Sequence, residues 1–167
     1  MKKSIAVVVA ALLSVSATVS ADDKAFAAFA CQNLVLDYAW HWDHDNHEDF
    51  ANLFTDDANF QAAGRQHTGR DEIYAEQKKR TGTVVTRTFF TNVRAIPVSD
   101  DTVEATSYLM VHSEPRPDTT SRRATSVPTR GFRIIGEMAF TCSLTDDGWK
   151  ISMVDLTPVF LDENLED

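Results

Sequence analysis

The stretch HWDHDNHED places three histidines and four carboxylates within residues 41–49. Histidine titrates near neutral pH, so a side chain of this kind can transfer protons. Histidines and carboxylates that converge can instead bind a metal ion, here through His44, His47 and a carboxylate on the opposite side. The stretch spans the predicted end of one helix and the start of the next, where acidic residues are favoured. We therefore favour a polar corner without a metal, in which Asp43 and His41 face inward.

Other candidates for acid/base chemistry lie on the same helix and on a predicted strand. Tyr38 and His41 are three residues apart and so share one face of a helix, where they could act as a pair. His112 is a second histidine that could move a proton. Trp42 is expected in the core or in the wall of a pocket rather than as a platform for a cofactor.

Three polar residues of the predicted strands could contact a ligand. Arg87 could hold a carboxylate or phenolate oxygen. Tyr108 is on the same strand face as His112, and is either a ligand contact or a packed aromatic with its hydroxyl at the surface. Glu137 lies in an apolar strand, where a carboxylate is costly unless it is paired or hydrated, so it faces a pocket or lies at an edge.

The elements that must position these residues follow from the spacing of apolar side chains. Helical spacing predicts a long helix over residues 22–43, a short one near 50–54 and a third over 68–80. The segment 55–63 is expected to turn into a strand. Runs rich in β-branched and aromatic residues then predict strands over 84–98, 102–114, 131–144 and 149–160. Helices followed by strands indicate an α+β domain, with three N-terminal helices on a curved, mostly antiparallel sheet that encloses a pocket.

The N-terminal residues 1–21 have the pattern of a secretory signal: two lysines, an apolar run, then Val19, Ser20 and Ala21. Cleavage after Ala21 would leave a domain of 146 residues (167 − 21), enough for one core, exported to the periplasm or secreted. Loss of two lysines would change the net charge from −9 to −11. This acidic balance argues against nucleic acid or an anionic membrane as the main partner.

Cys31 and Cys142 are the two cysteines of the chain. In an oxidising compartment such a pair is expected to form a disulfide, although two buried thiols are the alternative. The irregular segment 115–130, rich in arginine, proline, serine and threonine, is either a solvated hairpin tip, a lid or a subunit contact.

Six local patterns, in order, resemble the SnoaL-like branch of the nuclear-transport-factor-two-like superfamily, which includes scytalone dehydratase and hexachlorocyclohexane dehydrochlorinase. They are LDYAWHWDHDN, FANLFTDDANF, HTGRDEI, FFTNVRAI, VEATSYLMV and DGWKI, and the resemblance covers residues 22–160. It implies a cone-shaped α+β barrel around an apolar pocket, and a homodimer as the default assembly.

The resemblance also implies roles for particular residues. In the lyases of this group a carboxylate of the first helix supports a strand histidine that removes a proton from the substrate. Asp43 matches the carboxylate, and the histidine position, four residues before Asn92, holds Thr88. Asn92 could contact a ligand or satisfy backbone groups at a strand bend, and Thr88 leaves the family pair incomplete.

These observations lead to a functional hypothesis with an alternative. The hypothesis is an exported, cofactor-free lyase, dehydratase or isomerase for a small hydrophobic oxygenated molecule, aromatic or alicyclic. In it Asp43 orients or ionises a neighbour, Tyr38 polarises an oxygen, and His41 or His112 moves the proton. The alternative is a pocket protein of the same fold that binds a small ligand without chemistry, which Thr88 favours. A role in assembly alone is a third reading.

Overall fold

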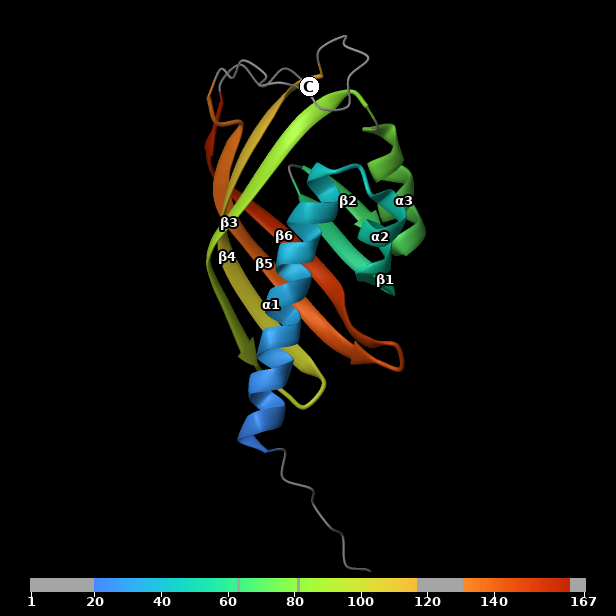
Figure 1. The fold of residues 1–167 in the computed structure, drawn as a ribbon, viewed down its shortest axis with the longest axis vertical. Helices are drawn as coiled ribbons and strands as arrows, with labels where there is room; N and C mark the ends of the chain where they lie inside the picture. Colours follow the sequence, from blue (N-terminus) through green and yellow to red (C-terminus); the bar gives the residue numbers. More distant parts are fainter. Residues whose placement is uncertain (1–19, 63, 81, 117–130, 163–167) are drawn as a thin grey trace, which may run out of the picture.

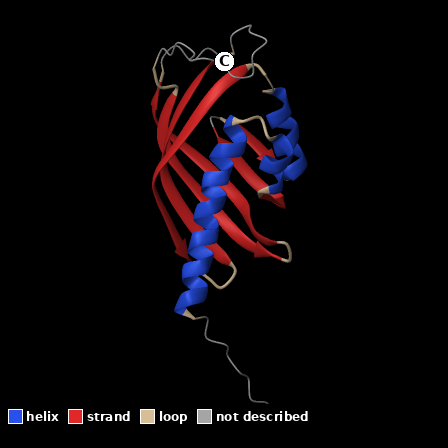
Figure 2. Ribbon diagram, in the orientation of Figure 1, coloured by secondary structure: helices blue, strands red, loops and turns tan. Residues whose placement is uncertain are grey.

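The computed structural model describes residues 20–62, 64–80, 82–116 and 131–162. Three helices, α1 (Ala21–Asp43), α2 (His47–Asn52) and α3 (Arg70–Lys79), lie against one face of a six-stranded sheet (Figures 1 and 2). The strands are β1 (Phe54–Ala62), β2 (Arg65–Thr68), β3 (Val84–Pro97), β4 (Thr102–Pro115), β5 (Ile134–Thr145) and β6 (Gly148–Leu161). The predicted α+β plan, with three helices ahead of four long strands, is confirmed.

The strand order is β2-β1-β6-β5-β4-β3, and every pairing is antiparallel except β1 with β6. The sheet curves around α1 but does not close into a barrel, because β2 and β3 are its two edges. The expected curved, mostly antiparallel sheet is confirmed, and it is open at these two edges. None of the described helices is both long enough and apolar enough to cross a membrane.

The segment 55–63 was expected to turn into a strand, and in the structure the strand β1 already begins at Phe54. Asp56 and Asp57 are both exposed within the strand, and the pairing of β1 with β6 shifts register between Phe54 and Asn59. This irregularity lets two consecutive carboxylates face solvent, whereas a regular strand would alternate. Asp56 forms an ion pair with Arg70 at 2.7 Å.

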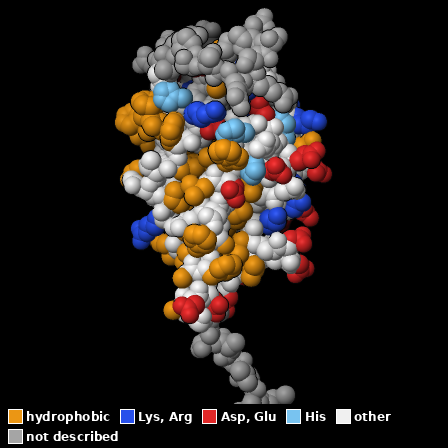
Figure 3. Space-filling model, in the orientation of Figure 1, with side chains coloured by type: hydrophobic (Ala, Val, Ile, Leu, Met, Phe, Trp, Pro, Cys, Tyr) orange, Lys and Arg blue, Asp and Glu red, His pale blue; other side chains and the backbone are white. Residues whose placement is uncertain are grey.

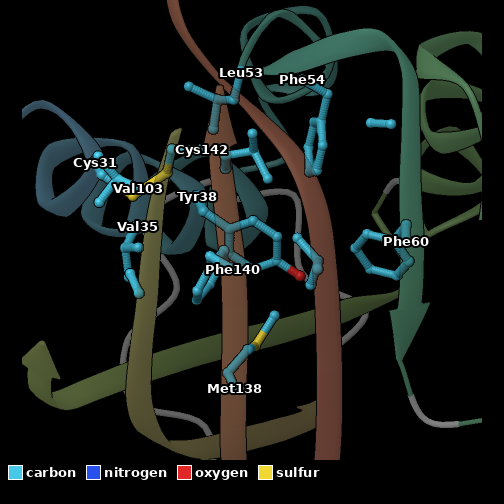
Figure 4. Close-up of a cluster of buried hydrophobic side chains, with 14 of the residues drawn as sticks. Cys31, Val35, Tyr38, Leu53, Phe54, Phe60, Val103, Met138, Phe140 and Cys142 are labelled. Carbon is cyan, nitrogen blue, oxygen red and sulfur yellow. A yellow bond between two sulfur atoms is a disulfide. The ribbon is translucent and has the colours of Figure 1, made fainter. Parts of the chain in front are cut away.

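The core lies between α1 and the inner face of the sheet. It is built largely from aromatic rings that surround Tyr38 (Figure 4), and the Cys31–Cys142 disulfide joins α1 to β5 at one side of it. The predicted disulfide is therefore present, with both cysteines fully buried. The predicted signal segment lies almost entirely outside the described residues, as does most of segment 115–130. The predicted cleavage after Ala21 stays a prediction.

We expect Gly136→Ala to destabilise the fold. A Cβ at Gly136 would lie 2.7 Å from the carbonyl oxygen of Thr157 and 3.2 Å from Cα of Pro158, both on the paired strand β6. Overpacking against backbone costs about 1–3 kcal/mol, and chemical denaturation would measure this loss. An unchanged denaturation midpoint would mean that β6 moves aside without cost.

Candidate functional site

Asp43, the last residue of α1, lies against strand β3. Its carboxylate accepts hydrogen bonds from the backbone N–H of Thr88 at 2.7 Å and from the Thr88 hydroxyl at 2.9 Å. Both the backbone and the side chain of Thr88 thus contact the carboxylate directly. The two bonds hold the end of α1 against β3 and fix the orientation of the Asp43 side chain.

Partial burial governs the protonation of Asp43. Desolvation raises the pKa of this carboxyl above its ordinary value, while the hydrogen bonds from Thr88 and the charges of Arg87 and His44 act in the opposite direction. The effect of burial on the pKa is the largest of these, because taking a carboxylate out of water disfavours its charged form. Asp43 is therefore a stronger proton acceptor than a carboxylate at the surface.

Tyr38 is five residues before Asp43 on α1 and lies at the centre of the aromatic core. Its ring is within 6.5 Å, centroid to centroid, of six other rings: Trp42, Phe50, Phe54, Phe60, Phe90 and Phe140. Burial strongly raises the pKa of the phenol, so the hydroxyl stays protonated at ordinary pH. No hydrogen bond of this hydroxyl occurs within the described part of the chain. Figure 4 shows the oxygen directed into the interior.

Trp42 carries a cation on its face. The guanidinium carbon of Arg80 lies 3.9 Å from the centre of the Trp42 ring, in cation–π geometry. Arg80 also donates to the side chains of Gln77 at 3.1 Å and Thr86 at 3.0 Å. Its positive charge lowers the pKa of Tyr38 against the larger effect of burial. Arg80 therefore places a fixed cation beside the buried phenol.

His41 does not join Asp43. The two residues are two positions apart on a helix, so their side chains diverge. Asp43 contacts β3, whereas Nδ1 of His41 lies 3.3 Å from the side-chain nitrogen of Asn46. Within the described residues, no hydrogen bond joins His41 to Asp43 or to Tyr38, with which it was expected to pair.

Three predicted ligand contacts and His112, a predicted proton-transfer residue, lie on the outer face of the sheet. Ser107 and Leu109 of β4 are buried toward the helices, so the alternating residues point the other way: Tyr108, His112, and their cross-strand neighbours Glu137 and Arg87. Tyr108 is 53% exposed. The structure thus separates this set from Tyr38 and Asp43, because neighbouring residues of a strand face opposite sides.

Asn92 lies at a bulge of β3. Its φ is 55°, and the pairing of β3 with β4 shifts register between Thr91 and Arg94. Asparagine tolerates this left-handed backbone better than most residues. The structure therefore favours the strand-bend interpretation of Asn92 over a ligand contact.

The HWDHDNHED stretch forms the corner between α1 and α2. Nδ1 of His44 lies 2.6 Å from the carbonyl oxygen of Trp40, and Asp45 forms an ion pair with Arg116 at 3.1 Å. Among the described residues, no three histidine, cysteine or acidic side chains converge as a metal site requires.

Comparison with known proteins identifies the family. The sequence model of the SnoaL-like domain matches residues 27–155. The chain belongs to this family. No curated protein matches the chain in sequence.

Solved structures of similar fold cover most of this chain. A protein from Novosphingobium aromaticivorans named for scytalone dehydratase is 21% identical, with a TM-score of 0.69 over 84% of this chain and 89% of that one. A type 2 hexachlorocyclohexane dehydrochlorinase is 18% identical, with a TM-score of 0.69 over 84% and 90%. A type 3 dehydrochlorinase from Novosphingobium barchaimii is 17% identical, with a TM-score of 0.67 over 86% and 93%. At these identities the likeness establishes the fold alone.

Two contacts of the candidate site do not follow from local sequence patterns. Helical spacing predicts only that Arg80 ends the third helix, but its side chain reaches Trp42 on another helix. Arg116 was assigned to an irregular loop, but it bonds Asp45 and also the carbonyl oxygen of Val84 at 3.0 Å. Neither contact can be predicted from local sequence, because each joins segments that are distant in the chain.

The raised pKa of Asp43 predicts how stability depends on pH. An unfolded carboxyl releases its proton near pH 3.8, whereas folded Asp43 holds it to higher pH. Asp43 therefore contributes most to stability below that value, and its contribution is lost as pH rises through the folded pKa. The difference in free energy of unfolding between wild type and Asp43→Asn, measured over a pH series, should fall with pH in this window. A difference that rises with pH would mean that the folded pKa is lowered.

Proposed function

We propose that this chain is an exported, cofactor-free enzyme of the dehydratase, lyase or isomerase type. Its substrate in this proposal is a small, largely apolar molecule, aromatic or alicyclic, that carries an oxygen. One observation carries the proposal: the protonated hydroxyl of Tyr38, which forms no hydrogen bond with the described residues, is five residues along α1 from a carboxylate with a raised pKa. A hydroxyl that no described protein group engages can donate a hydrogen bond to a ligand oxygen.

Each side chain has a role in this proposal. The Tyr38 hydroxyl donates a hydrogen bond to the ligand oxygen on which negative charge develops, and the charge of Arg80 stabilises that state. Asp43, held by Thr88, takes a proton from the ligand. The proton then returns to another ligand atom in an isomerisation, or leaves with a departing hydroxyl group as water. Trp42 contributes an apolar surface beside the reacting atoms.

Names of structural neighbours support a reaction of this class. A dehydratase removes water and a dehydrochlorinase removes hydrogen chloride, so each of these named reactions includes the loss of a proton from the substrate. The disulfide supports export, because such bonds persist in oxidising compartments. Sequencing the N-terminus of protein recovered from a periplasmic fraction would test cleavage after Ala21.

A binding protein without chemistry is the second candidate. Both Thr88 donors are directed at Asp43, and no described histidine lies within hydrogen-bond distance of that carboxylate. Incubation with a panel of phenols, cyclic alcohols and cyclic ketones, followed by mass spectrometry, separates the two proposals. An enzyme converts at least one compound to an isomer or to a product lighter by one water. A binding protein returns every bound compound unchanged.

We also propose a homodimer formed through the outer face of the sheet. Phe89 and Tyr108 are 47% and 53% exposed on this face, in diagonal positions on the adjacent strands β3 and β4. Exposed apolar side chains that lie near one another favour association. Light scattering of the purified protein would give twice the monomer mass. A monomer at high concentration would contradict this assembly.

A further inference from the structure

An open groove runs along the first half of α1, apart from Tyr38 and Asp43. Its volume is about 650 Å³, and the turns β3–β4 and β5–β6 form its other sides. We call it the α1 groove. It is lined by Asp23, Lys24, Phe26, Ala27, Ala30, Asn33, Leu34, Asp37, Pro97, Ser99, Asp100, Leu144, Gly148 and Trp149.

The α1 groove has an apolar floor. Ala27, Leu34 and Trp149 belong to the core or pack against it, so they form a fixed surface. Phe26 is different, because its ring is 66% exposed although it lines the groove. Exposed apolar side chains along α1 are visible in Figure 3. An exposed ring beside a fixed apolar floor is available as an anchor for a partner.

The charge around the α1 groove is strongly negative. Three pairs of consecutive aspartates lie at the start of α1 and in the two turns: residues 22–23, 100–101 and 146–147. Figure 1 shows these three places at one end of the molecule. Among the residues lining the groove, Asp23, Asp37 and Asp100 face a single cation, Lys24. Such an arrangement attracts positive charge over a broad area.

The length of the α1 groove indicates the kind of occupant. From Asp23 to Asp37 the lining covers 14 helical steps (37 − 23), about 21 Å at 1.5 Å per residue. A compact cation could not contact both ends or all three aspartate pairs. A segment with apolar side chains on one face and several lysines or arginines on the other matches the floor and the rim together.

We propose that the α1 groove binds a basic amphipathic segment of a partner protein. The apolar face of the segment packs on Leu34 and Trp149 and against the ring of Phe26. Its cations lie beside the aspartates of the two turns. This site does not use the residues proposed for catalysis, so binding here and turnover are independent properties of the chain.

A synthetic probe tests the proposal. The probe is a fluorescein-labelled, 15-residue peptide of leucine and lysine, with leucines at helical spacing, and its control is a peptide of the same composition in scrambled order. Fluorescence anisotropy should show binding about tenfold tighter for the patterned peptide, a difference of about 1.4 kcal/mol. Equal binding of both peptides would overturn the proposal, because the apolar floor would then play no part.

Two exposed phenylalanines of α1 provide matched variants. Phe26→Ala should weaken binding of the patterned peptide about fivefold or more, since loss of an anchor costs more than about 1 kcal/mol. Phe29 is 60% exposed but does not line the groove, so Phe29→Ala should leave binding unchanged. Equal effects of the two substitutions would overturn the proposal. Because both side chains are exposed, both variants should fold.

Two double variants that remove negative charges test the electrostatic contribution to peptide binding. The double variant Asp37→Asn, Asp100→Asn should weaken binding and reduce its dependence on salt, whereas Glu48→Gln, Asp49→Asn on α2 should do neither. If the two double variants behaved alike, attraction would come from the net charge of the protein and not from the groove.

Discussion

Removal of the Cys31–Cys142 disulfide is expected to lower the free energy of unfolding by about 4 kcal/mol. The two residues are 111 positions apart in sequence, so the bond closes a loop that contains most of the domain. A crosslink over such a loop restricts the unfolded chain strongly. The loss would be a large part of the total stability of a domain of this size.

Denaturation with and without reductant measures this effect. The reductant must be present during unfolding, because both cysteines are fully buried in the fold. The double variant Cys31→Ala, Cys142→Ala serves as the control, since its midpoint should be low and insensitive to reductant. If reduction left the midpoint of the wild type unchanged, the disulfide would not stabilise the domain in this way.

Asp43→Asn and Tyr38→Phe are each expected to lower kcat/KM about a hundredfold or more for any substrate that the enzyme converts. Asparagine cannot take the proton, and general base catalysis typically contributes a factor of about 10² or more. Phenylalanine cannot donate to the oxygen on which charge develops, and loss of one such donor costs about as much. Both substitutions preserve the shape of the side chain.

Two controls separate chemistry from folding. Asp49→Asn removes an exposed carboxylate of α2 and should leave kcat/KM unchanged. Thermal unfolding should show that Asp43→Asn and Tyr38→Phe fold. Folded variants with wild-type turnover would exclude both residues from catalysis, and turnover lost in Asp49→Asn as well would point to a general effect of charge.

Helices and long strands could be predicted because their sequence periods are clear. Helical spacing predicts α1, but the buried face is formed by Ala27, Cys31, Val35 and Tyr38, whereas Phe26 and Phe29 of the same helix are exposed. Strand β2 has four residues and no buried one, so its pairing with β1 leaves little pattern in the sequence. The exposed Asp56 and Asp57 of β1 likewise contradict the usual preferences of strands and depend on an irregular pairing with β6.

The site could be predicted only in part. Tyr38 and Asp43 could be predicted as site residues from their positions on the first helix. Along β4, the alternation of residues defines two faces, but it does not show which face packs against the helices. Glu104 is exposed on the same face as Tyr108, and its charge was a signal that this face points outward. The contact of Arg80 with Trp42 joins two helices distant in sequence, and no local pattern encodes it.

The central claim is that Asp43 is a desolvated carboxylate held by Thr88. Titration of the Asp43 carboxyl carbon by NMR tests it without knowledge of the substrate. The pKa of the wild type should lie above the ordinary value for aspartate, and Thr88→Val should raise it further by removing one donor, whereas Thr91→Val on the outer face should not. A wild-type pKa at or below the ordinary value, unchanged by Thr88→Val, would contradict the account.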